Sequence, residues 1–322
     1  MRALICGVGG QDGAYLSKLL LEKGYGVIGA SRDAMASSFT NLNRLGIRHK
    51  VITASMAISD FRSVLQTLDK YQPDEIYNLA GQSSVGLSFE QPVETMESIA
   101  IGTLNLLEAI RFYGKPIRFY SAGSSECFGD TCTHPANEET PFKPRSPYAV
   151  AKTSAHNLVA NYREAYNLYA CTGILFNHES PFRPERFVTQ KIIRTAARIA
   201  AGSGEKLKMG NIDIQRDWGW APEYVEAMWK MIQLDQPRDF VIATGKTVSL
   251  EYFIEYTFQI FGLDYKEYLE VNASLYRPTD IRIGSANPAK AHELLHWRAQ
   301  VNVEGVIEKM CAAAKESVNA LT

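Results

Sequence analysis

Residues 2–24, "RALICGVGGQDGAYLSKLLLEKG", decide the fold expected for this 322-residue chain. The stretch begins with a short apolar run, passes through a loop that contains Gly7, Gly10 and Gly13, and ends in an amphipathic segment. A short apolar run bounded by turn residues is typical of a strand buried on both faces, and the leucine spacing over 14–24 is typical of a helix. The stretch therefore predicts a strand, a glycine-rich turn and a helix.

The same alternation continues through the first half of the chain. Further strand-like runs lie at 26–31, 74–80, 117–123 and 170–177, and helix-like segments at 93–114 and 147–167. Strands that alternate with helices indicate a parallel sheet covered by helices on both faces. We expect an α/β fold with a doubly wound parallel sheet.

Two further segments refine this prediction. Ser146 and Pro147 suit the cap and the first turn of a helix, so the segment that follows should place Tyr148 and Lys152 on one face. After residue 177 the chain becomes richer in Pro, Arg and polar residues, and the alternation weakens. We expect a smaller, mixed C-terminal domain there, with "DFVIAT", residues 239–244, returning to the main sheet.

The composition limits the classes of partner. Lys and Arg total 34 against 35 for Asp and Glu, with no long block of one sign, so no nucleic-acid or membrane partner is expected. The five scattered cysteines and the absence of a signal peptide or a long apolar run indicate a cytoplasmic protein. The six histidines form no pair at ligand spacing, so no metal site is expected.

The glycine loop predicts a nucleotide site. Gly7, Gly10 and Gly13 form a G-x-x-G-x-x-G pattern between the first strand and the first helix, with Gln11 and Asp12 inside it. Backbone without side chains can approach a pyrophosphate there, at the positive end of the helix. A simple tight turn is the alternative, but the position favours dinucleotide binding.

The end of the second strand bears on the choice of dinucleotide. An acid there binds the ribose diol, whereas an arginine accepts a 2′-phosphate. The sequence has Arg32, which favours NADP, followed by Asp33, which would repel a phosphate or bind a diol. NADP is the preferred cofactor, and NAD stays open.

A tyrosine and a lysine one helical turn apart are typical of a phenol that acts as a base beside a nicotinamide. We expect the ammonium of Lys152 and the cofactor's positive ring to lower the pKa of Tyr148, and Ser124 upstream to assist. A solvent-exposed pair on an amphipathic helix is the alternative. The glycine loop at the start of the chain favours catalysis.

The chain resembles the extended short-chain dehydrogenase/reductase superfamily and, within it, the GDP-mannose 4,6-dehydratases. The resemblance spans nearly the whole chain and rests on the glycine loop and on the blocks "EIYNLAGQSSVGLSF", "SSECFG", "TPFKPRSPYAVAK", "NHESPFRP", "QRDWGWAPEYVEAMW" and "YRPTDIRIG". The blocks "NHESP" and "QRDWG" are specific to the dehydratases rather than to the superfamily. The resemblance implies a Rossmann fold.

The resemblance also implies the chemistry. Ser124, Tyr148 and Lys152 would oxidise carbon 4 of GDP-mannose, and Glu126 would remove the proton at carbon 5. Water then leaves carbon 6, and tightly bound NADP returns the hydride, giving GDP-4-keto-6-deoxymannose. A GDP-4-keto-6-deoxy-sugar reductase or epimerase, a dehydratase of a related GDP-sugar, and a non-enzymatic NADP sensor are the alternatives. The blocks "NHESP" and "QRDWG" favour the dehydratase.

The remaining expectations concern binding residues, domains and assembly. The residues expected at the cofactor are Gly7, Gly10, Gln11, Asp12, Gly13, Arg32, Leu79, Ala80, Tyr148 and Lys152. Those expected at the GDP-sugar are Ser83, Ser84, Ser125, Asn177, Val188, Lys191, Arg216 and Arg277. Residues 1–177 and about 213–247 would form the dinucleotide-binding domain, and 178–212 and about 248–322 the nucleotide-sugar-binding domain. A homodimer or homotetramer is expected.

The chain departs from the family pattern at three positions. Ser124 stands where threonine is usual, Asp33 where a second arginine is usual, and Ser55 near a usual aspartate that binds adenine. The change at Asp33 leaves the NADP preference and the tetramer open. Cys127 follows Glu126 in a segment expected to be extended, which would turn the thiol away from the site.

Overall fold

The computed structural model describes residues 1–132 and 134–319. Its largest element is a parallel sheet of seven strands in the order β10-β6-β5-β4-β1-β2-β3. The strands are β1 Arg2–Cys6, β2 Gly26–Ser31, β3 Ile52–Ser55, β4 Glu75–Asn78, β5 Arg118–Ala122, β6 Ala170–Leu175 and β10 Phe240–Ile242. This arrangement confirms the doubly wound fold, and β10 confirms that "DFVIAT" returns to the main sheet.

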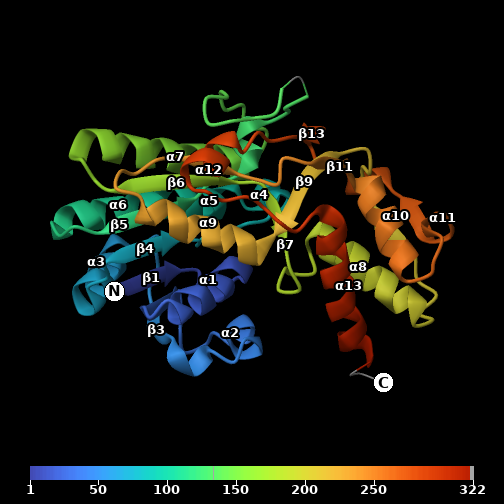
Figure 1. Ribbon diagram of the computed structural model, residues 1–322, viewed down its shortest axis with the longest axis horizontal. Coiled ribbons are helices and arrows are strands. Elements are labelled where there is room, and N and C mark those ends of the chain that lie inside the picture. The colour runs from blue at the N-terminus through green and yellow to red at the C-terminus, as the bar shows by residue number, and fades with distance from the viewer. Residues whose placement is uncertain (133, 320–322) are drawn as a thin grey trace.

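Helices cover both faces of the sheet. Along β1, Ala3 and Ile5 belong to one hydrophobic core, and Leu4 and Cys6 to another on the opposite face. α1 (Gln11–Glu22) and α9 (Ala221–Gln233) pack together on the first face. α3 (Phe61–Tyr71), α6 (Gly102–Tyr113) and α7 (Pro147–Tyr166) cover the second (Figure 1). Burial on both faces explains why the strands are apolar without alternation.

The helix that carries Tyr148 and Lys152 begins where the sequence predicts. The Ser146 hydroxyl accepts a hydrogen bond from the backbone N–H of Ala149 at 3.1 Å, and Pro147 occupies the first turn. Proline fits that position because the first N–H groups of a helix have no intrahelical acceptor. The predicted cap of α7 is confirmed.

The segment 93–114, expected as one helix, contains a π-helical turn. α5 (Pro92–Met96) passes through the turn Glu97–Ile101 into α6. Gly102 follows at a close contact, since a Cβ there would lie 2.8 Å from Cδ1 of Ile58. The apolar periodicity of the segment predicts a helix but does not indicate the wider turn, which is common at functional sites.

A second, mixed sheet supports the smaller part of the molecule. β9 (Gln215–Trp220) pairs parallel to β7 (Asn177–Glu179) and β13 (Ile283–Gly284) and antiparallel to β11 (Thr247–Ser249). Beside it lie α8 Val188–Ala200, α10 Leu250–Ile260, α13 Val303–Asn319 and the strand pair β8 Leu207–Met209 and β12 Leu269–Val271. The mixed C-terminal part is confirmed, while the domain boundaries remain a proposal.

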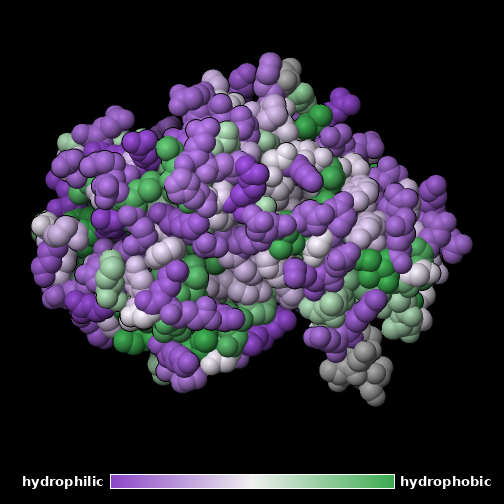
Figure 2. Space-filling model, in the orientation of Figure 1, coloured by the Kyte–Doolittle hydropathy of each residue, from purple (hydrophilic) through white to green (hydrophobic). Residues whose placement is uncertain are grey.

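The other elements are short, and the surface is mainly polar. The short helices are α2 Thr40–Arg44, α4 Val85–Glu90, α11 Tyr265–Tyr268, α12 Ala289–Leu294 and the single turns η1 Arg48–Lys50, η3 Ser125–Phe128 and η4 Ala273–Leu275. Figure 2 shows hydrophilic residues over most of one face, with smaller apolar areas between them. No helix within the described ranges has both the length and the apolar character needed to cross a bilayer.

Candidate active site

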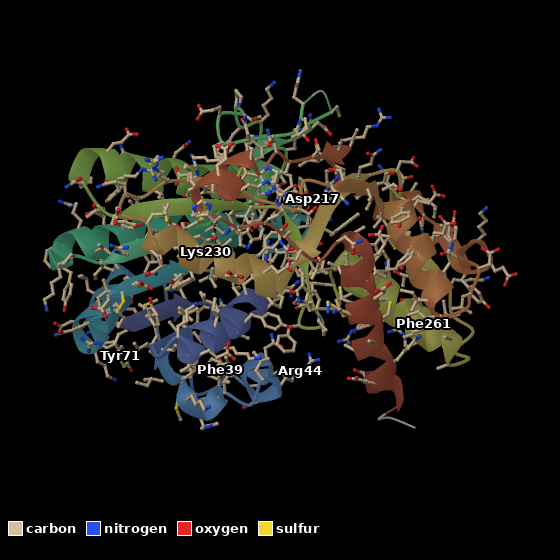
Figure 3. All side chains as sticks on the ribbon, in the orientation of Figure 1. Phe39, Arg44, Tyr71, Asp217, Lys230 and Phe261 are labelled. Atoms are coloured by element: carbon tan, nitrogen blue, oxygen red, sulfur yellow. The ribbon has the colours of Figure 1, made fainter. Side chains whose placement is uncertain are left out.

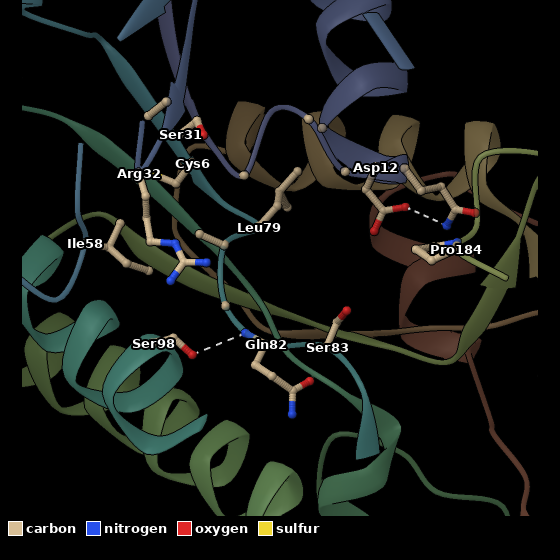
Figure 4. Close-up of a pocket in the computed structure, with 18 of the residues that line it drawn as sticks. Cys6, Asp12, Ser31, Arg32, Ile58, Leu79, Gln82, Ser83, Ser98 and Pro184 are labelled. Atoms are coloured by element: carbon tan, nitrogen blue, oxygen red, sulfur yellow. Dashed lines mark hydrogen bonds between the residues drawn. The ribbon is translucent and has the colours of Figure 1, made fainter. Parts of the chain in front are cut away.

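A cavity of about 700 Å³ lies at the carboxyl ends of β1, β2 and β4. Figure 4 shows Arg32, Ile58 and Ser98 on one side of it, Asp12 and Pro184 on the other, and Gln82 and Ser83 below. All eight residues expected at the cofactor outside α7 line its wall, namely Gly7, Gly10, Gln11, Asp12, Gly13, Arg32, Leu79 and Ala80. Parallel α/β sheets bind ligands at this edge.

The glycine loop fits a pyrophosphate. Gly7 has a φ of 84°, and a Cβ there would lie 2.9 Å from the carbonyl oxygen of Leu79. A Cβ on Gly13 would lie 2.7 Å from Cα of Val8. Gly10, the residue before α1, provides no side-chain cap, so the first N–H groups of α1 remain available to an anion.

Of the neighbouring residues Arg32 and Asp33, only Arg32 lines the cavity. Arg32 lines the cavity, and its side chain is 84% exposed. Asp33 does not line the cavity, because its Oδ1 accepts hydrogen bonds from the backbone N–H groups of Met35 at 2.9 Å and Ala36 at 3.0 Å. The expectation that Asp33 faces the ribose is wrong, since the carboxylate stabilises the turn of its own loop.

One wall of the cavity comes from residues that the sequence did not single out. Glu94, Glu97 and Ser98 lie on the face of α5 and its π turn, and the Ser98 hydroxyl accepts a hydrogen bond from the backbone N–H of Gln82 at 3.2 Å. Helical spacing of three and four residues puts them on one face, a signal that was available in the sequence. Arg183 and Arg186, from the Arg-rich segment after β7, also line the cavity.

A buried ion pair joins the glycine loop to β7. His178 Nε2 lies 2.9 Å from Asp12 Oδ2, and Gln11 Nε2 donates to Asp12 Oδ1 at 3.0 Å and to the His178 carbonyl at 3.1 Å. Burial would raise the pKa of Asp12 and lower that of His178, but their mutual attraction reverses both shifts. The block "NHESP" therefore contacts the nucleotide loop directly, which the sequence did not predict.

Next to it, Glu179 holds one of the cavity arginines. Glu179 is 1% exposed, accepts a hydrogen bond from Thr189 Oγ1 at 2.7 Å, and lies 3.3 Å from Nε of Arg183. The Arg183 guanidinium also stacks over Phe187, 3.9 Å from the ring centroid. A buried carboxylate needs such partners, and they fix Arg183 at the cavity wall.

The predicted catalytic side chains gather at the end of β5 and the start of α7. Ser124 accepts a hydrogen bond from the backbone N–H of Glu126 at 3.3 Å, and its hydroxyl lies near the phenol of Tyr148. Lys152 Nζ donates to the carbonyl oxygen of Ala122 at 2.8 Å and lies 5.8 Å from the centroid of the Tyr148 ring. Tyr148 and Lys152 share one face of α7, as predicted.

The pKa of Tyr148 shifts in the opposite direction to the one expected. Burial raises it above the ordinary range for tyrosine, and the nearby Ser124 hydroxyl opposes this shift. Burial also lowers the pKa of Lys152 to about 8. The expected lowering of the Tyr148 pKa by the ammonium is therefore wrong for the chain by itself, in which the phenol is more deeply desolvated than the sequence indicates.

Glu126 lies in a second group of charges. Burial raises the pKa of its carboxyl group, and Arg216 and Arg277 oppose that shift. Arg216 is 5% exposed and lies 3.3 Å from Asp280 Oδ1, and Arg277 lies 3.6 Å from the same atom. Two of the predicted substrate residues are thus near the predicted base, together with Asp280, which the sequence analysis did not single out.

Asp217, the residue after Arg216, anchors β9. Oδ1 of Asp217 accepts hydrogen bonds from the N–H of Thr244 at 3.1 Å and from the Thr244 hydroxyl at 2.8 Å. Oδ2 of Asp217 accepts one from the N–H of Gly245 at 2.7 Å. Burial still raises its pKa to about 6. Figure 3 labels Asp217 beside the strand that Figure 1 labels β9. The hydrogen bonds of Asp217 tie β9, in the second sheet, to the residues that follow β10 in the first.

The other predicted substrate residues lie as follows. Ser83 lines the cavity, and Ser84 caps α4 by accepting a hydrogen bond from the N–H of Leu87 at 3.3 Å. Ser125 is in η3, Asn177 begins β7, Val188 begins α8, and Lys191 donates from Nζ to the carbonyl of Lys208 at 2.5 Å. Their roles remain predictions.

Cys127 also differs from the expectation. Residues 125–128 form a 3₁₀ turn rather than an extended segment, and the buried thiol of Cys127 bonds to the carbonyl oxygen of Ala149, 3.8 Å from Sγ. The Ser124 side chain caps this turn. A serine that caps a tight turn favours local hydrogen bonds over extended backbone.

The chain is similar to known proteins over nearly its whole length. The family described as GDP-mannose 4,6 dehydratase matches residues 4–310. GDP-mannose 4,6 dehydratase 1 of Arabidopsis thaliana is 46% identical over 96% of this chain and 88% of its own length. The GDP-mannose 4,6-dehydratase of Sinorhizobium fredii is 43% identical over 99% and 97%.

Solved structures show the same fold at lower sequence identity. A dTDP-glucose 4,6-dehydratase from Streptomyces venezuelae superimposes with a TM-score of 0.89 at 19% identity, covering 99% of this chain and 98% of that one. A UDP-glucose 4-epimerase from Thermotoga maritima gives 0.88 at 23% identity, covering 99% and 100%. With the family match and the identity of the two relatives, the chain belongs to the GDP-mannose 4,6-dehydratase family.

Proposed function

We propose that this chain converts GDP-mannose to GDP-4-keto-6-deoxymannose and water, with a nicotinamide dinucleotide that is regenerated in each cycle. One observation carries the proposal: a single turn after β5 presents Ser124 to the phenol of Tyr148 and Glu126 to the arginines. A hydroxyl oxidation and a proton abstraction need both groups at neighbouring carbons of one sugar. The names of the related proteins support the same reaction.

The cofactor we propose is NADP, with NAD open. It would accept a hydride from the sugar and return it later in the cycle. The glycine loop and the first turn of α1 would hold its pyrophosphate, and Arg32 would face its adenosine ribose. Leu79, Ala80, Tyr148 and Lys152 would lie along its nicotinamide half.

The oxidation requires a base at the hydroxyl of carbon 4. Tyr148 would take this proton, and Ser124, whose hydroxyl lies near the phenol, would orient the carbon-4 hydroxyl of the sugar. The half-buried Lys152, which donates a hydrogen bond to the Ala122 carbonyl, would stabilise the phenolate as it forms. Such proton transfer contributes about 10²–10⁴-fold to the rate.

The elimination requires a second base. Once carbon 4 is a ketone, the hydrogen on carbon 5 becomes acidic, and Glu126 would remove it while water leaves carbon 6. The raised pKa of Glu126 makes it a stronger base than a solvated glutamate. Arg216 and Arg277 oppose this rise and so favour the carboxylate form.

The substrate would lie against the second sheet. Arg216 and Arg277 would bind the diphosphate, because a guanidinium donates two parallel hydrogen bonds to phosphate oxygens. The other residues proposed at the GDP-sugar are Ser83, Ser84, Ser125, Asn177, Val188 and Lys191. A related GDP-sugar, a homodimer or homotetramer and a cytoplasmic location are further parts of this proposal.

The test is to incubate the purified protein with GDP-mannose and no added cofactor, and to follow the product by mass spectrometry. Loss of one water with no net consumption of NADPH is the expected result. A product that retains the carbon-6 hydroxyl would contradict the dehydratase. In a parallel incubation with GDP-4-keto-6-deoxymannose and added NADPH, consumption of one NADPH for each sugar would favour a reductase instead.

A further inference from the structure

We propose that Glu94 weakens the preference of this chain for NADP over NAD by pairing with Arg32 at the adenosine end of the cavity. The inference rests on the proposed function, because it assumes that the cavity binds a nicotinamide dinucleotide. Arg32 Nη1 lies 3.9 Å from Glu94 Oε1 across the cavity wall. Both residues line the cavity.

Arg32 and Glu94 approach the adenosine end of the cavity from different elements. Arg32 follows β2, whose carboxyl end faces the ribose that carries a 2′-hydroxyl or a 2′-phosphate. Figure 4 shows its guanidinium extended toward the helices beside Ser98. Glu94, in α5, lies one helical turn before Ser98 on the same face and so meets the guanidinium from the other side.

The charges at this end do not favour a 2′-phosphate. Arg32 is a cation, but Glu94 and Glu97 both line the same wall as carboxylates. Asp33, the expected source of repulsion, is turned into its own loop. Glu94 therefore replaces Asp33 as the acid that competes with a phosphate for Arg32.

The expected size of the effect follows from exposure. The Arg32 side chain is 84% exposed and that of Glu94 45%, so solvent and salt screen the pair. An exposed pair changes affinity by about two- to fivefold. Glu94 should thus weaken discrimination between NADP and NAD without abolishing binding of either.

The experiment measures dissociation constants of the cofactor-free protein for NADPH and NADH by fluorescence titration. Glu94→Gln removes the charge and keeps the size of the side chain. It should tighten NADPH binding about three- to fivefold and leave NADH within about twofold. The gain should shrink as salt is added, since both groups are exposed.

Two comparisons make the result specific to the pair. In an Arg32→Ala background, Glu94→Gln should lose most of its effect on NADPH, because the cation that it frees is absent. Glu90→Gln, an exposed glutamate on α4 that does not line the cavity, is the matched control and should change neither constant.

An equal change for both cofactors, or an undiminished change without Arg32, would overturn the inference and leave the proposed function standing. No binding of either dinucleotide by the unaltered chain would overturn both. Unfolding midpoints equal to that of the unaltered chain establish that each variant is folded.

Discussion

The two ends of the site are built by different means. At the proposed cofactor end, the wall of the site is formed by backbone: Gly7 with its positive φ, Gly13 with no room for a Cβ, and the first turn of α1. The proposed substrate end instead contains charged side chains that are almost fully buried, Arg216 at 5% and Asp217 at 0% exposure. The first end should respond to added volume and the second to removed charge.

The largest expected effect lies at the substrate end. Glu126→Gln removes the proposed base for carbon 5 and should lower the dehydration rate about 10²–10⁴-fold. Because Tyr148 and Ser124 are intact, the oxidation should still occur and leave reduced cofactor visible by its absorbance. Tyr148→Phe should lose activity without that absorbance.

Glu139→Gln, an exposed glutamate in the loop that follows, is the control and should keep full activity. If Glu126→Gln kept a rate near that of the unaltered chain, the role of Glu126 would be wrong. The statement that the substrate end responds to removed charge would then be contradicted.

The next effect lies at the cofactor end. Gly13→Ala places a methyl group 2.7 Å from the backbone of Val8, so it should lower the free energy of unfolding by about 2–3 kcal/mol and weaken cofactor binding. Gly9→Ala in the same loop is the matched control. Its Cβ would meet nothing nearer than Phe39 Cδ1 at 3.8 Å. Equal urea midpoints for the two variants would contradict the claim that added volume at Gly13 is destabilising.

A smaller effect concerns pH. The pKa of Lys152 is lowered to about 8, so its ammonium form is lost as the pH rises through that value. If the ammonium stabilises the phenolate, kcat/KM should fall by about tenfold per pH unit above this pKa. Lys152→Arg should be slower but should lack this limb, because a guanidinium stays charged. If kcat/KM of Lys152→Arg fell in the same pH range, the fall would come from the titration of another group.

The sequence predicted backbone-determined features well. The cap at Ser146, the glycine loop and the alternation of strands and helices follow from local residue preferences, which act over a few neighbours. All eight predicted loop and strand-end residues line the cavity for the same reason. Local rules were sufficient there.

The features that were missed depend on partners distant in sequence. His178 pairs with Asp12, and Asp217 bonds to Thr244, contacts that only the folded chain brings together. The pKa of Tyr148 was misjudged because its burial comes from packing that the spacing of Tyr and Lys does not reveal. The pKa of a buried group therefore depends on distant neighbours, whereas a helix cap or a glycine loop can be recognised from its own residues.

The smallest expected effect concerns Asp33. Its Oδ1 accepts from the N–H groups of Met35 and Ala36, and an asparagine Oδ1 can accept both. Asp33→Asn should therefore leave the NADPH and NADH dissociation constants within about twofold of the unaltered chain, since exposed charges that do not face the ligand contribute little. Glu94→Gln makes the same change of charge on the cavity wall and should change the ratio more.

The two variants together separate charge from position. If Asp33→Asn shifted the NADPH to NADH ratio as much as Glu94→Gln, the loop after β2 would have to turn its carboxylate toward the ribose. The conformation of the loop after β2 would then not hold the Asp33 side chain away from the cavity. Asp33→Ala gives the complementary measurement, because it removes both hydrogen bonds and should loosen the loop by about 1 kcal/mol whichever cofactor is bound.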